Sequence, residues 1–423
     1  MKVRFINARI LTMKDEEDIF NGEIQIIDDR ISYIGKAIEC NDDFDRVIDC
    51  KNNLIMPGFK NAHTHSGMSV LRSLADDLPL DKWLNESIFP VEAKMTEEDI
   101  YYMSKLSVLE YLTSGITACF DMYLTPMSIA KSMDDIGFRC VQVGAMNNFS
   151  QSVDLLEEMY LKLNKDDSLQ SYIIGFHAEY TTSLENLLAI RDLAHKYKAP
   201  VFTHLSETEN EVNGCIERHN MTPLKFLDSL GMFDYGGGIY HGVYITDEEM
   251  DIINKKNLYV VTNPASNAKL ASGIAPISKY LDKNINVAIG TDGPASNNCL
   301  DMFREMFLVT SLAKLKDMDA SSVDANEVLK MATVNGAKAM GLYDCDVLDV
   351  GKKADLIMLD LNMPNMQPIN NIKKNIVYSG SKINVKLTMI NGNILYENGE
   401  FYIGEDVSNI YNAVEKIKDR IIN

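Results

Sequence analysis

The sequence is poor in cysteine, histidine and tryptophan: its 423 residues include seven Cys, seven His and one Trp. The cysteines are Cys40, Cys50, Cys119, Cys140, Cys215, Cys299 and Cys345. They are scattered, odd in number and form no CxxC pair, which excludes a disulfide framework and a cysteine-rich zinc knuckle. Reduced thiols of this kind are typical of the cytoplasm, so we expect a cytoplasmic protein.

Long apolar runs and positive charge are also scarce. The sequence has no run of 18 apolar residues, and its start, MKVRFINARILTMKDEED, becomes charged early, so we expect neither a membrane span nor a signal peptide. With 41 Lys and Arg against 61 Asp and Glu, the net charge is −20. Because such a surface repels phosphate backbones and anionic lipid, nucleic acid and membranes are excluded as expected partners. The oligomeric state stays open, with a homo-oligomer as one option.

Both ends of the chain are rich in short β-like runs. The candidate strands are Val3–Ile10, Gly22–Ile27, Arg30–Ile34, Ala354–Leu361, Val385–Ile390 and Asn393–Glu397, with a turn-rich segment at Lys14–Asp18. Asn391-Gly392 is a strong hairpin signal, and Asp406–Ile422 has the pattern of an amphipathic helix. We expect residues 1–58 and 350–423 to form one small β-sandwich domain.

Between these ends, apolar strand-like runs alternate with longer helical patterns. The candidate strands are Ile116–Phe120, Arg139–Val143, Tyr172–Phe176, Val201–His204, Gly238–His241, Leu258–Val261 and Asn286–Ile289. Helical patterns include Glu97–Ser114, Leu184–Tyr197 and Asp247–Lys255. This alternation predicts an α/β fold, a (β/α)8 TIM barrel over residues 59–349.

Histidines and one aspartate stand where these strands end. His63 and His65 follow the strand-like run LIMPGF, and residues at i and i+2 of a strand point to the same face. His204, His241 and Asp292 each end a later run. Taken alone, each also fits a hydrogen-bonded polar strand end. Because the carboxyl ends of barrel strands meet on one rim, however, the set predicts a metal site there.

The motifs PGFKNAHTH, VFTHLSE, YHGVY and IGTDGPASNN resemble strands 1, 5, 6 and 8 of the amidohydrolase superfamily, and the resemblance covers almost the whole chain. The stretches LRSLADDLPLDKWLNESIFPVEAKMTEEDIYY and NPASNAKLASGIAPI are similar to its branch of methylthioadenosine/S-adenosylhomocysteine deaminases and chlorohydrolase relatives. The resemblance implies an enzyme that deaminates an adenosine-type nucleoside to the inosine analogue and ammonia.

The same resemblance assigns the metal ligands to His63, His65, His204 and Asp292. Imidazoles with one carboxylate suit Zn²⁺, with Fe²⁺ as the alternative, and leave one position for water. Binuclear members of the superfamily carry a lysine after the fourth strand, where this chain reads GFHAEYTTS. We therefore expect one divalent metal per chain.

The catalytic residues that the resemblance implies are Glu207, His241 and Asp292. Asp292 would take a proton from water, and His241 would orient that water. Glu207 would protonate the purine at N1 and then pass protons to the leaving ammonia. In isolation, Glu207 equally fits an acid that stabilises the start of a helix.

The implied substrate-binding residues are Glu92, His177, Glu207 and Trp83. Glu92 would hold the ribose hydroxyls, and His177 would bond a purine ring nitrogen. Trp83 would pack over the substrate, although a lone tryptophan equally fits a core position. An exposed carboxylate at a helix start and a polar strand end are the plainer interpretations of Glu92 and His177.

One departure from the branch concerns the 5′ substituent. Deaminases of the branch that accept S-adenosylhomocysteine usually carry an arginine where this chain has Gly144, and another shortly after it. Here no arginine occurs between Arg139 and Arg191. A homocysteine carboxylate would lack its bidentate partner. Methylthioadenosine, 5′-deoxyadenosine or adenosine are therefore the expected substrates ahead of S-adenosylhomocysteine.

Two other functions remain open at this point. A deaminase or chlorohydrolase acting on a free heterocycle such as guanine would share the metal ligands, but it would have no ribose for Glu92. A catalytically silent metal-binding barrel would need none of the catalytic residues that this chain retains. The zinc signature of cytidine deaminases, H-x-E with PCxxC, does not occur in the sequence.

Overall fold

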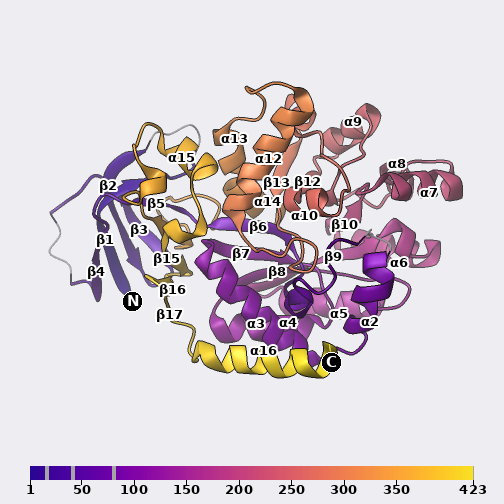
Figure 1. The fold of residues 1–423 in the computed structure, drawn as a ribbon, viewed down its shortest axis with the longest axis horizontal. Helices are drawn as coiled ribbons and strands as arrows, with labels where there is room; N and C mark the ends of the chain where they lie inside the picture. The colour runs from indigo at the N-terminus through magenta and orange to yellow at the C-terminus, as the bar shows by residue number, and fades with distance from the viewer. Residues whose placement is uncertain (15–18, 40–42, 79–81, 423) are drawn as a thin grey trace.

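The computed structural model of the protein describes residues 1–14, 19–39, 43–78 and 82–422. Two sequence features, Cys40 and most of the turn at Lys14–Asp18, lie outside the described residues. The described strands form two sheets, one of eight strands and one of nine. Figure 1 shows them side by side, with both chain ends contributing to the nine-stranded sheet. The expected α/β fold is confirmed: a barrel with a separate β unit built from both chain ends, which forms one nine-stranded sheet where the sequence predicted a small β-sandwich.

The eight-stranded sheet is an almost closed barrel of parallel strands in consecutive order. Its strands are β6 (Phe59–Thr64), β7 (Ile116–Asp121), β8 (Arg139–Val143), β9 (Gln170–Ala178), β10 (Val201–Leu205), β11 (Gly237–His241), β12 (Tyr259–Thr262) and β13 (Asn286–Ile289). Nearly all their residues are buried, as expected for strands covered on both faces.

The sequence located these strands to within a few residues, with one difference at the point where the chain passes from the outer sheet into the barrel. The run LIMPGF is divided between two sheets: β5 (Leu54–Pro57) pairs with β1 and β14 in the outer sheet, and β6 begins at Phe59 in the barrel. Gly58 lies between them, where a Cβ atom would be only 2.1 Å from the Thr117 side chain. The close approach of Thr117 therefore requires a glycine where the chain passes between the sheets.

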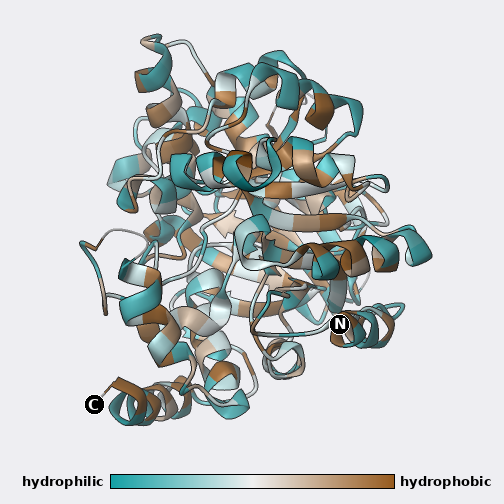
Figure 2. Ribbon diagram, turned by 90° about the vertical axis from the view of Figure 1, so that its right-hand side faces the viewer, coloured by the Kyte–Doolittle hydropathy of each residue, from teal (hydrophilic) through white to brown (hydrophobic). Residues whose placement is uncertain are grey.

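Helices cover the outside of the barrel. They are α3 (Glu97–Thr113), α4 (Pro126–Ile136), α5 (Val153–Leu163), α6 (Leu184–Tyr197), α7 (Glu209–His219), α8 (Pro223–Ser229), α9 (Asp247–Lys255), α10 (Pro264–Lys269), α11 (Ile277–Asp282), α12 (Met302–Asp317), α13 (Ala325–Lys330) and α14 (Gly336–Ala339). Figure 2 shows that many of them carry both hydrophilic and hydrophobic residues. Thr96 and Thr246 begin α3 and α9 with capping boxes, which explains why the sequence located both helices well.

The nine-stranded sheet combines β1 (Lys2–Ile10), β2 (Phe20–Ile27), β3 (Arg30–Gly35), β4 (Arg46–Asp49) and β5 with β14 (Leu356–Leu359), β15 (Val385–Ile390), β16 (Asn393–Glu397) and β17 (Glu400–Phe401). The two chain ends meet where β5 pairs antiparallel with β14. β15 and β16 form the hairpin that Asn391-Gly392 predicted. We propose that residues 1–58 and 350–423 form one domain.

The last helix, α16 (Val407–Ile422), extends from that sheet to the barrel. It lies along α3, as Figure 1 shows at the lower edge of the molecule. Arg420 pairs with Asp99, and Lys105 of α3 pairs with Glu405 just before α16. Among the described residues, no helix combines the length and apolarity needed to cross a membrane.

A buried ion pair joins the two sheets. Arg139, at the start of β8, donates two hydrogen bonds, of 2.6 and 3.0 Å, to the carboxylate of Asp355. Asp355 also accepts the backbone N–H of Asn391 at 2.8 Å. Both side chains of the pair are almost fully buried, so each charge depends on the other for its stabilisation.

The barrel closes where β13 meets β6, beside His63 in β6 and Asp292 just after β13. The Asp292 N–H donates to the His63 carbonyl at 3.0 Å, and Asn61 and Thr291 exchange hydrogen bonds of 2.7 and 2.9 Å. Gly290 permits this contact. A Cβ atom there would lie 2.7 Å from the His63 Cβ and 2.8 Å from the His63 backbone nitrogen. The contact between β13 and β6 is therefore close enough to hold His63 in place.

We expect Gly290→Ala to lower the free energy of unfolding by about 1–3 kcal/mol, because the added methyl group forces β13 away from β6. The thermal unfolding midpoint measures this loss. Gly214→Ala is the control, because it lies in α7 and its Cβ would meet only the end of the Arg218 side chain, at 3.0 Å. Alanine in a helix is expected to leave the midpoint unchanged or higher. Equal midpoints for the two variants would contradict the tight closure.

Candidate metal centre

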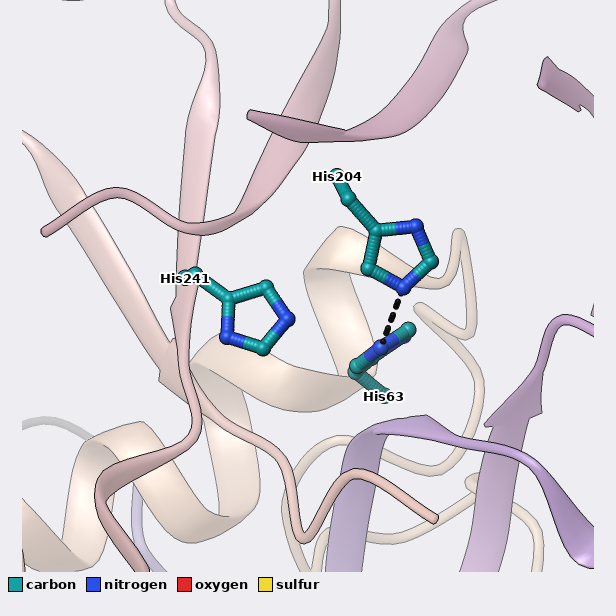
Figure 3. Close-up of side chains that lie close together, drawn as sticks. All are labelled: His63, His204 and His241. Carbon is teal, nitrogen blue, oxygen red and sulfur yellow. Dashed lines mark hydrogen bonds between the residues drawn. The ribbon is translucent and has the colours of Figure 1, made fainter. Parts of the chain in front are cut away.

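The histidines and the aspartate singled out in the sequence meet at one rim of the barrel. His63 lies in β6 and His65 just after it, His204 lies in β10, His241 ends β11, and Asp292 follows β13. All are at the carboxyl ends of their strands, where the functional groups of TIM barrels converge. Figure 3 shows the rings of His63, His204 and His241 around a common centre.

Their nitrogen and oxygen atoms are within a few ångströms of one another. The Nε2 atoms of His63 and His204 are 3.1 Å apart. Asp292 Oδ1 lies 3.1 Å from His65 Nε2 and 3.5 Å from His63 Nε2. Two overlapping sets of possible metal ligands result: His63, His204 and His241, and His63, His65 and Asp292.

The outer ring nitrogens determine which atoms face the centre. His204 Nδ1 donates to the carbonyl of His177 at 2.6 Å, and His65 Nδ1 donates to the carbonyl of Met122. With the proton on Nδ1, each ring presents the lone pair of its Nε2 to the centre when it is neutral. These Nε2 atoms would bind a cation at the centre, and backbone carbonyls commonly orient metal-bound histidines in this way.

Burial and charge also suit a divalent cation. Burial lowers the pKa of His63 to about 3 and that of His204 well below its usual value, which keeps both rings in the neutral form that binds metals. Burial alone would lower the pKa of His65 as well, but the hydrogen bond and the charge of Asp292 outweigh it and raise that pKa. Positive charge is therefore favoured beside Asp292, and the donor set fits a divalent metal.

Two serine hydroxyl groups hold Asp292 through Oδ2, the oxygen that does not face His63 and His65. Ser266 Oγ and Ser296 Oγ donate to Oδ2 at 2.6 and 2.9 Å, while the N–H of Gly293 donates to Oδ1 at 2.8 Å. The backbone of Asp292 has a positive φ of 60°, which is uncommon for a residue other than glycine. The orientation of this carboxylate is therefore imposed by its surroundings.

His241 is held in a similar way. Its φ is 71°, and its side chain is almost fully buried. Nδ1 donates to Asn267 Oδ1 at 2.8 Å, which leaves Nε2 as an acceptor facing the centre. Backbone strain of this kind clusters at functional sites, and it occurs here at two of the residues around the centre.

Glu207 lies beside His241, and its Oε2 is 3.7 Å from His241 Nε2. Ser272 Oγ donates to its other oxygen at 3.0 Å. The turn that carries Glu207 is fixed by Glu211, which accepts the N–H groups of Ser206 and Glu207 at 2.6 and 2.8 Å. Burial raises the pKa of Glu211 to about 7.

A cavity of about 540 Å³ opens above the centre. Its lining includes all the predicted catalytic and substrate-binding residues and every predicted metal ligand except the fully buried His63: Trp83, Glu92, His177, Glu207, His65, His204, His241 and Asp292. Trp83 is both buried and part of the wall, so a core position and a contact with the substrate are compatible for this residue. The volume is that of a pocket for a small organic molecule.

Glu92 and His177 are the other two candidate substrate-binding residues in the wall that carry polar groups. Glu92, in α2 (Phe89–Glu92), accepts a hydrogen bond of 2.6 Å from the Tyr123 hydroxyl, and burial raises its pKa. His177 Nδ1 is 2.9 Å from Thr181 Oγ1, and burial lowers the pKa of its ring to about 4. His177 is therefore a neutral hydrogen-bonding group at pH 7.

Sequence reasoning missed the residues that hold the site in place: Ser266, Asn267, Ser296, Glu211, Tyr123 and Thr181. Ser266 and Asn267 belong to the stretch NPASNAKLASGIAPI, and Ser296 to IGTDGPASNN. Those stretches supported the family resemblance, but their individual roles had no visible signal. A serine or asparagine in a loop reveals its partner only when the loop is folded against it.

A second group of possible metal ligands lies deeper, where Cys119 of β7 pairs in register with Cys140 of β8. With Asp121 they form a buried cluster. Burial raises the pKa of Cys119 well above its usual value and also raises that of Cys140, so both remain protonated thiols rather than metal-binding thiolates. The rim of the barrel is therefore the better metal centre.

Comparison with known proteins places this arrangement among characterised families. The sequence profile of the amidohydrolase family matches residues 54–395. A 5-methylthioadenosine/S-adenosylhomocysteine deaminase from Thermoanaerobacter pseudethanolicus is 40% identical, with 100% of both chains covered. A 5′-deoxyadenosine deaminase from Methanobrevibacter smithii is 37% identical, with 98% of this chain and 97% of the relative covered.

Among solved structures, an adenosine deaminase from Xanthomonas campestris with bound zinc superimposes with a TM-score of 0.93. The two chains are 30% identical, and the match covers 99% of this chain and 98% of the other. The likeness thus extends over the barrel and the outer sheet together.

We expect metal analysis to find about one equivalent of divalent metal per chain, because the donors converge on one centre. His204→Ala should lose this metal, since it removes a ligand atom at the middle of the set. Cys119→Ser is the control and should retain it. Two tightly held equivalents, or loss of metal from Cys119→Ser, would contradict a single centre at the rim.

Proposed function

The chain belongs to the amidohydrolase family, and we propose that it removes the 6-amino group of an adenosine-type nucleoside by hydrolysis. It is a metal-dependent hydrolase acting on a C–N bond, and its products are the inosine analogue and ammonia. The observation that carries this proposal is the position of Glu207, an acid at the edge of the histidine and aspartate cluster and in the wall of the cavity above it.

The proposed ligands of the cation are His63, His65, His204 and Asp292. Three imidazoles with one carboxylate favour Zn²⁺, with Fe²⁺ as the alternative. A bound cation of this kind supplies Lewis acidity, which lowers the pKa of a coordinated water towards ~7. The zinc in the Xanthomonas campestris structure supports this choice.

Asp292 and His241 are proposed to act on the attacking water. Asp292 takes the proton of the water, while Ser266 and Ser296 keep its other oxygen turned away from the cavity. His241 presents Nε2 as an acceptor because its Nδ1–H is bonded to Asn267. It therefore orients the water without first having to lose a proton.

Glu207 is proposed to act on the substrate. In its protonated form it donates to N1 of the purine, which makes C6 more electrophilic. Its carboxylate then takes the proton of the hydroxyl group newly bonded to C6 and passes it to the amino group, which leaves as ammonia as the C6 carbonyl forms; the proton that Asp292 took from the water remains to restore the acid form of Glu207. Ser272 holds one oxygen of Glu207, so the other faces His241 and the cavity.

The remaining wall residues are proposed to bind the nucleoside. Glu92 holds the ribose hydroxyls, and the neutral ring of His177 bonds a purine nitrogen. Trp83 offers an aromatic contact surface. With C6 of the purine at the metal end, the ribose points towards the mouth of the cavity, on the same side as Glu92.

The mouth of the cavity favours an uncharged 5′ substituent. Its lining includes Phe149, which is 92% exposed, and the half-exposed Phe89 and Tyr180. None of the described residues that line the cavity is a lysine or an arginine. Gly144 is not among the described residues that line the cavity, and a Cβ atom there would lie 2.6 Å from both the Gly175 carbonyl oxygen and Leu156 Cδ2.

Two alternative functions make different demands on the same site. A free heterocycle such as guanine would leave Glu92 without a ribose partner. A silent metal-binding barrel would have no use for Glu207 beside His241. The nucleoside deaminase uses both carboxylates, and it is therefore the function we propose.

We expect Glu207→Gln to retain metal and fold but to lose kcat by on the order of 10²-fold or more, because an amide cannot carry the proton to N1. Deamination is followed by the change in ultraviolet absorption. Glu209→Gln, two residues further on at the exposed start of α7, is the control and should keep normal turnover. Near-normal kcat in Glu207→Gln would show that another group moves the proton.

For the substrate, we expect kcat/KM to be higher for methylthioadenosine, 5′-deoxyadenosine or adenosine than for S-adenosylhomocysteine. A missing charge-assisted hydrogen bond is worth roughly 1.5–3 kcal/mol, or about ten- to a hundredfold in kcat/KM. The four nucleosides and guanine are assayed side by side. A clear preference for S-adenosylhomocysteine would refute the argument from the uncharged mouth, and activity on guanine alone would refute the ribose assignment of Glu92.

A further inference from the structure

Glu305 is a fully buried carboxylate that the proposed mechanism does not use. It lies in the first turn of α12, on the outer side of the barrel. A buried ionisable group without a matching charge is costly, and it persists only where its hydrogen bonds do something for the fold or the site. The partners of Glu305 indicate which.

Its two oxygens bind two different loops. Oε2 accepts the backbone N–H of Ala265 at 3.0 Å, and Oε1 accepts Asn297 Nδ2 at 2.8 Å. Ala265 lies in α10, in the turn that follows β12. Asn297 lies in the loop that follows β13 and also donates to the Thr291 carbonyl at 2.6 Å. Glu305 therefore bridges the ends of two neighbouring barrel strands.

These two loops carry the donors that orient the metal centre. Ser266, next to Ala265, and Ser296, next to Asn297, both donate to Asp292 Oδ2. Asn267 accepts from His241 Nδ1. Each of these three residues, the two serine donors and the asparagine acceptor, is thus one or two positions from a residue that Glu305 bonds. A shift of either loop changes the direction of Asp292, of His241, or of both.

We propose that Glu305 is a positioning residue: by bonding Ala265 and Asn297 at once, its carboxylate aligns Ser266 and Ser296 on Asp292 and Asn267 on His241. This proposal rests on the assignment of Asp292 as a metal ligand.

The two contacts favour the carboxylate form: burial raises the pKa of Glu305 to about 8, and the hydrogen bonds from Ala265 and Asn297 act against that rise. Both partners are N–H donors, so both oxygens of Glu305 must accept. A glutamine of the same shape has one accepting oxygen and one NH₂ group, which would face a donor. Rotating the Asn297 amide to present its oxygen would sacrifice the bond to Thr291. Glu305→Gln is therefore expected to release one loop while leaving the core volume unchanged.

The test compares Glu305→Gln with Glu249→Gln in the metal-loaded protein. Glu249 is also fully buried, in the first turn of α9, but among the described residues its carboxylate bonds just its own helix cap, through the N–H and Oγ1 of Thr246, both at 2.9 Å. Metal retention is measured by competition with a chromophoric chelator. We expect Glu305→Gln to release Zn²⁺ about ten- to a hundredfold more easily than the wild type, as for other groups that orient metal ligands, and Glu249→Gln to match the wild type.

Kinetics and a double-mutant cycle distinguish positioning from general destabilisation. Glu305→Gln should lower kcat by about tenfold or more with KM changed less than about threefold, because the substrate contacts remain. In a Ser266→Ala/Ser296→Ala background the same substitution should lower kcat by a clearly smaller factor than in the wild type, since the two donors to Asp292 are gone and only the Asn267–His241 contact is left to align. A purely structural role would give independent, multiplicative losses.

The outcomes separate this inference from the proposed function. A wild-type protein that holds no metal and deaminates no nucleoside would overturn both. A wild-type protein that does both, with normal metal retention and normal kcat in Glu305→Gln, would overturn the positioning role alone. Equal losses in Glu305→Gln and Glu249→Gln would likewise overturn it, because they would reflect burial of the carboxylate rather than its two bonds.

Discussion

The contact between β6 and β13 is the constraint on which the site depends. β6 carries His63, and Asp292 follows β13. His63 Nε2 lies 3.5 Å from Asp292 Oδ1 only because the barrel closes there. Gly290 permits that closure, since any side chain would meet His63. The hydrogen bond from the Asp292 N–H to the His63 carbonyl then fixes the position of Asp292 relative to His63 along the two strands. A sheet open at this edge would hold the same residues without a metal centre.

Around this contact, the molecule stabilises an arrangement that would otherwise be unfavourable. Nitrogen lone pairs and a carboxylate face one another at the rim, and two residues there, His241 and Asp292, adopt positive φ angles. Backbone carbonyls, serine hydroxyls and the amide of Asn267 hold each group from outside. A preorganised site of this kind binds a cation and the developing charge of a reaction without further rearrangement. The Arg139–Asp355 pair separately anchors the barrel to the outer sheet.

The metal end and the mouth of the cavity have different chemical characters, which matches the two demands of a nucleoside deaminase. The metal end is buried and rich in groups that exchange protons. The mouth exposes aromatic rings such as Phe149 and, among its described residues, no cationic side chain. The reaction is thus set by residues deep in the barrel, whereas the choice among nucleosides falls to loops that can vary without disturbing the fold.

The sequence by itself determined the order of the barrel strands and the residues that end them. Alternating strand and helix patterns and His63, His65, His204, His241 and Asp292 are local features, because a strand and its last residue are read from neighbouring positions. The sequence also located α3, α6 and α9, which begin with clear capping residues. Only the tertiary structure decided the division of LIMPGF between two sheets and the partners of the site, Ser266, Asn267, Ser296, Glu211 and Glu305. Those contacts join residues distant in the chain, and a hydrogen-bond partner is specified by where loops meet in space rather than by the pattern of either loop.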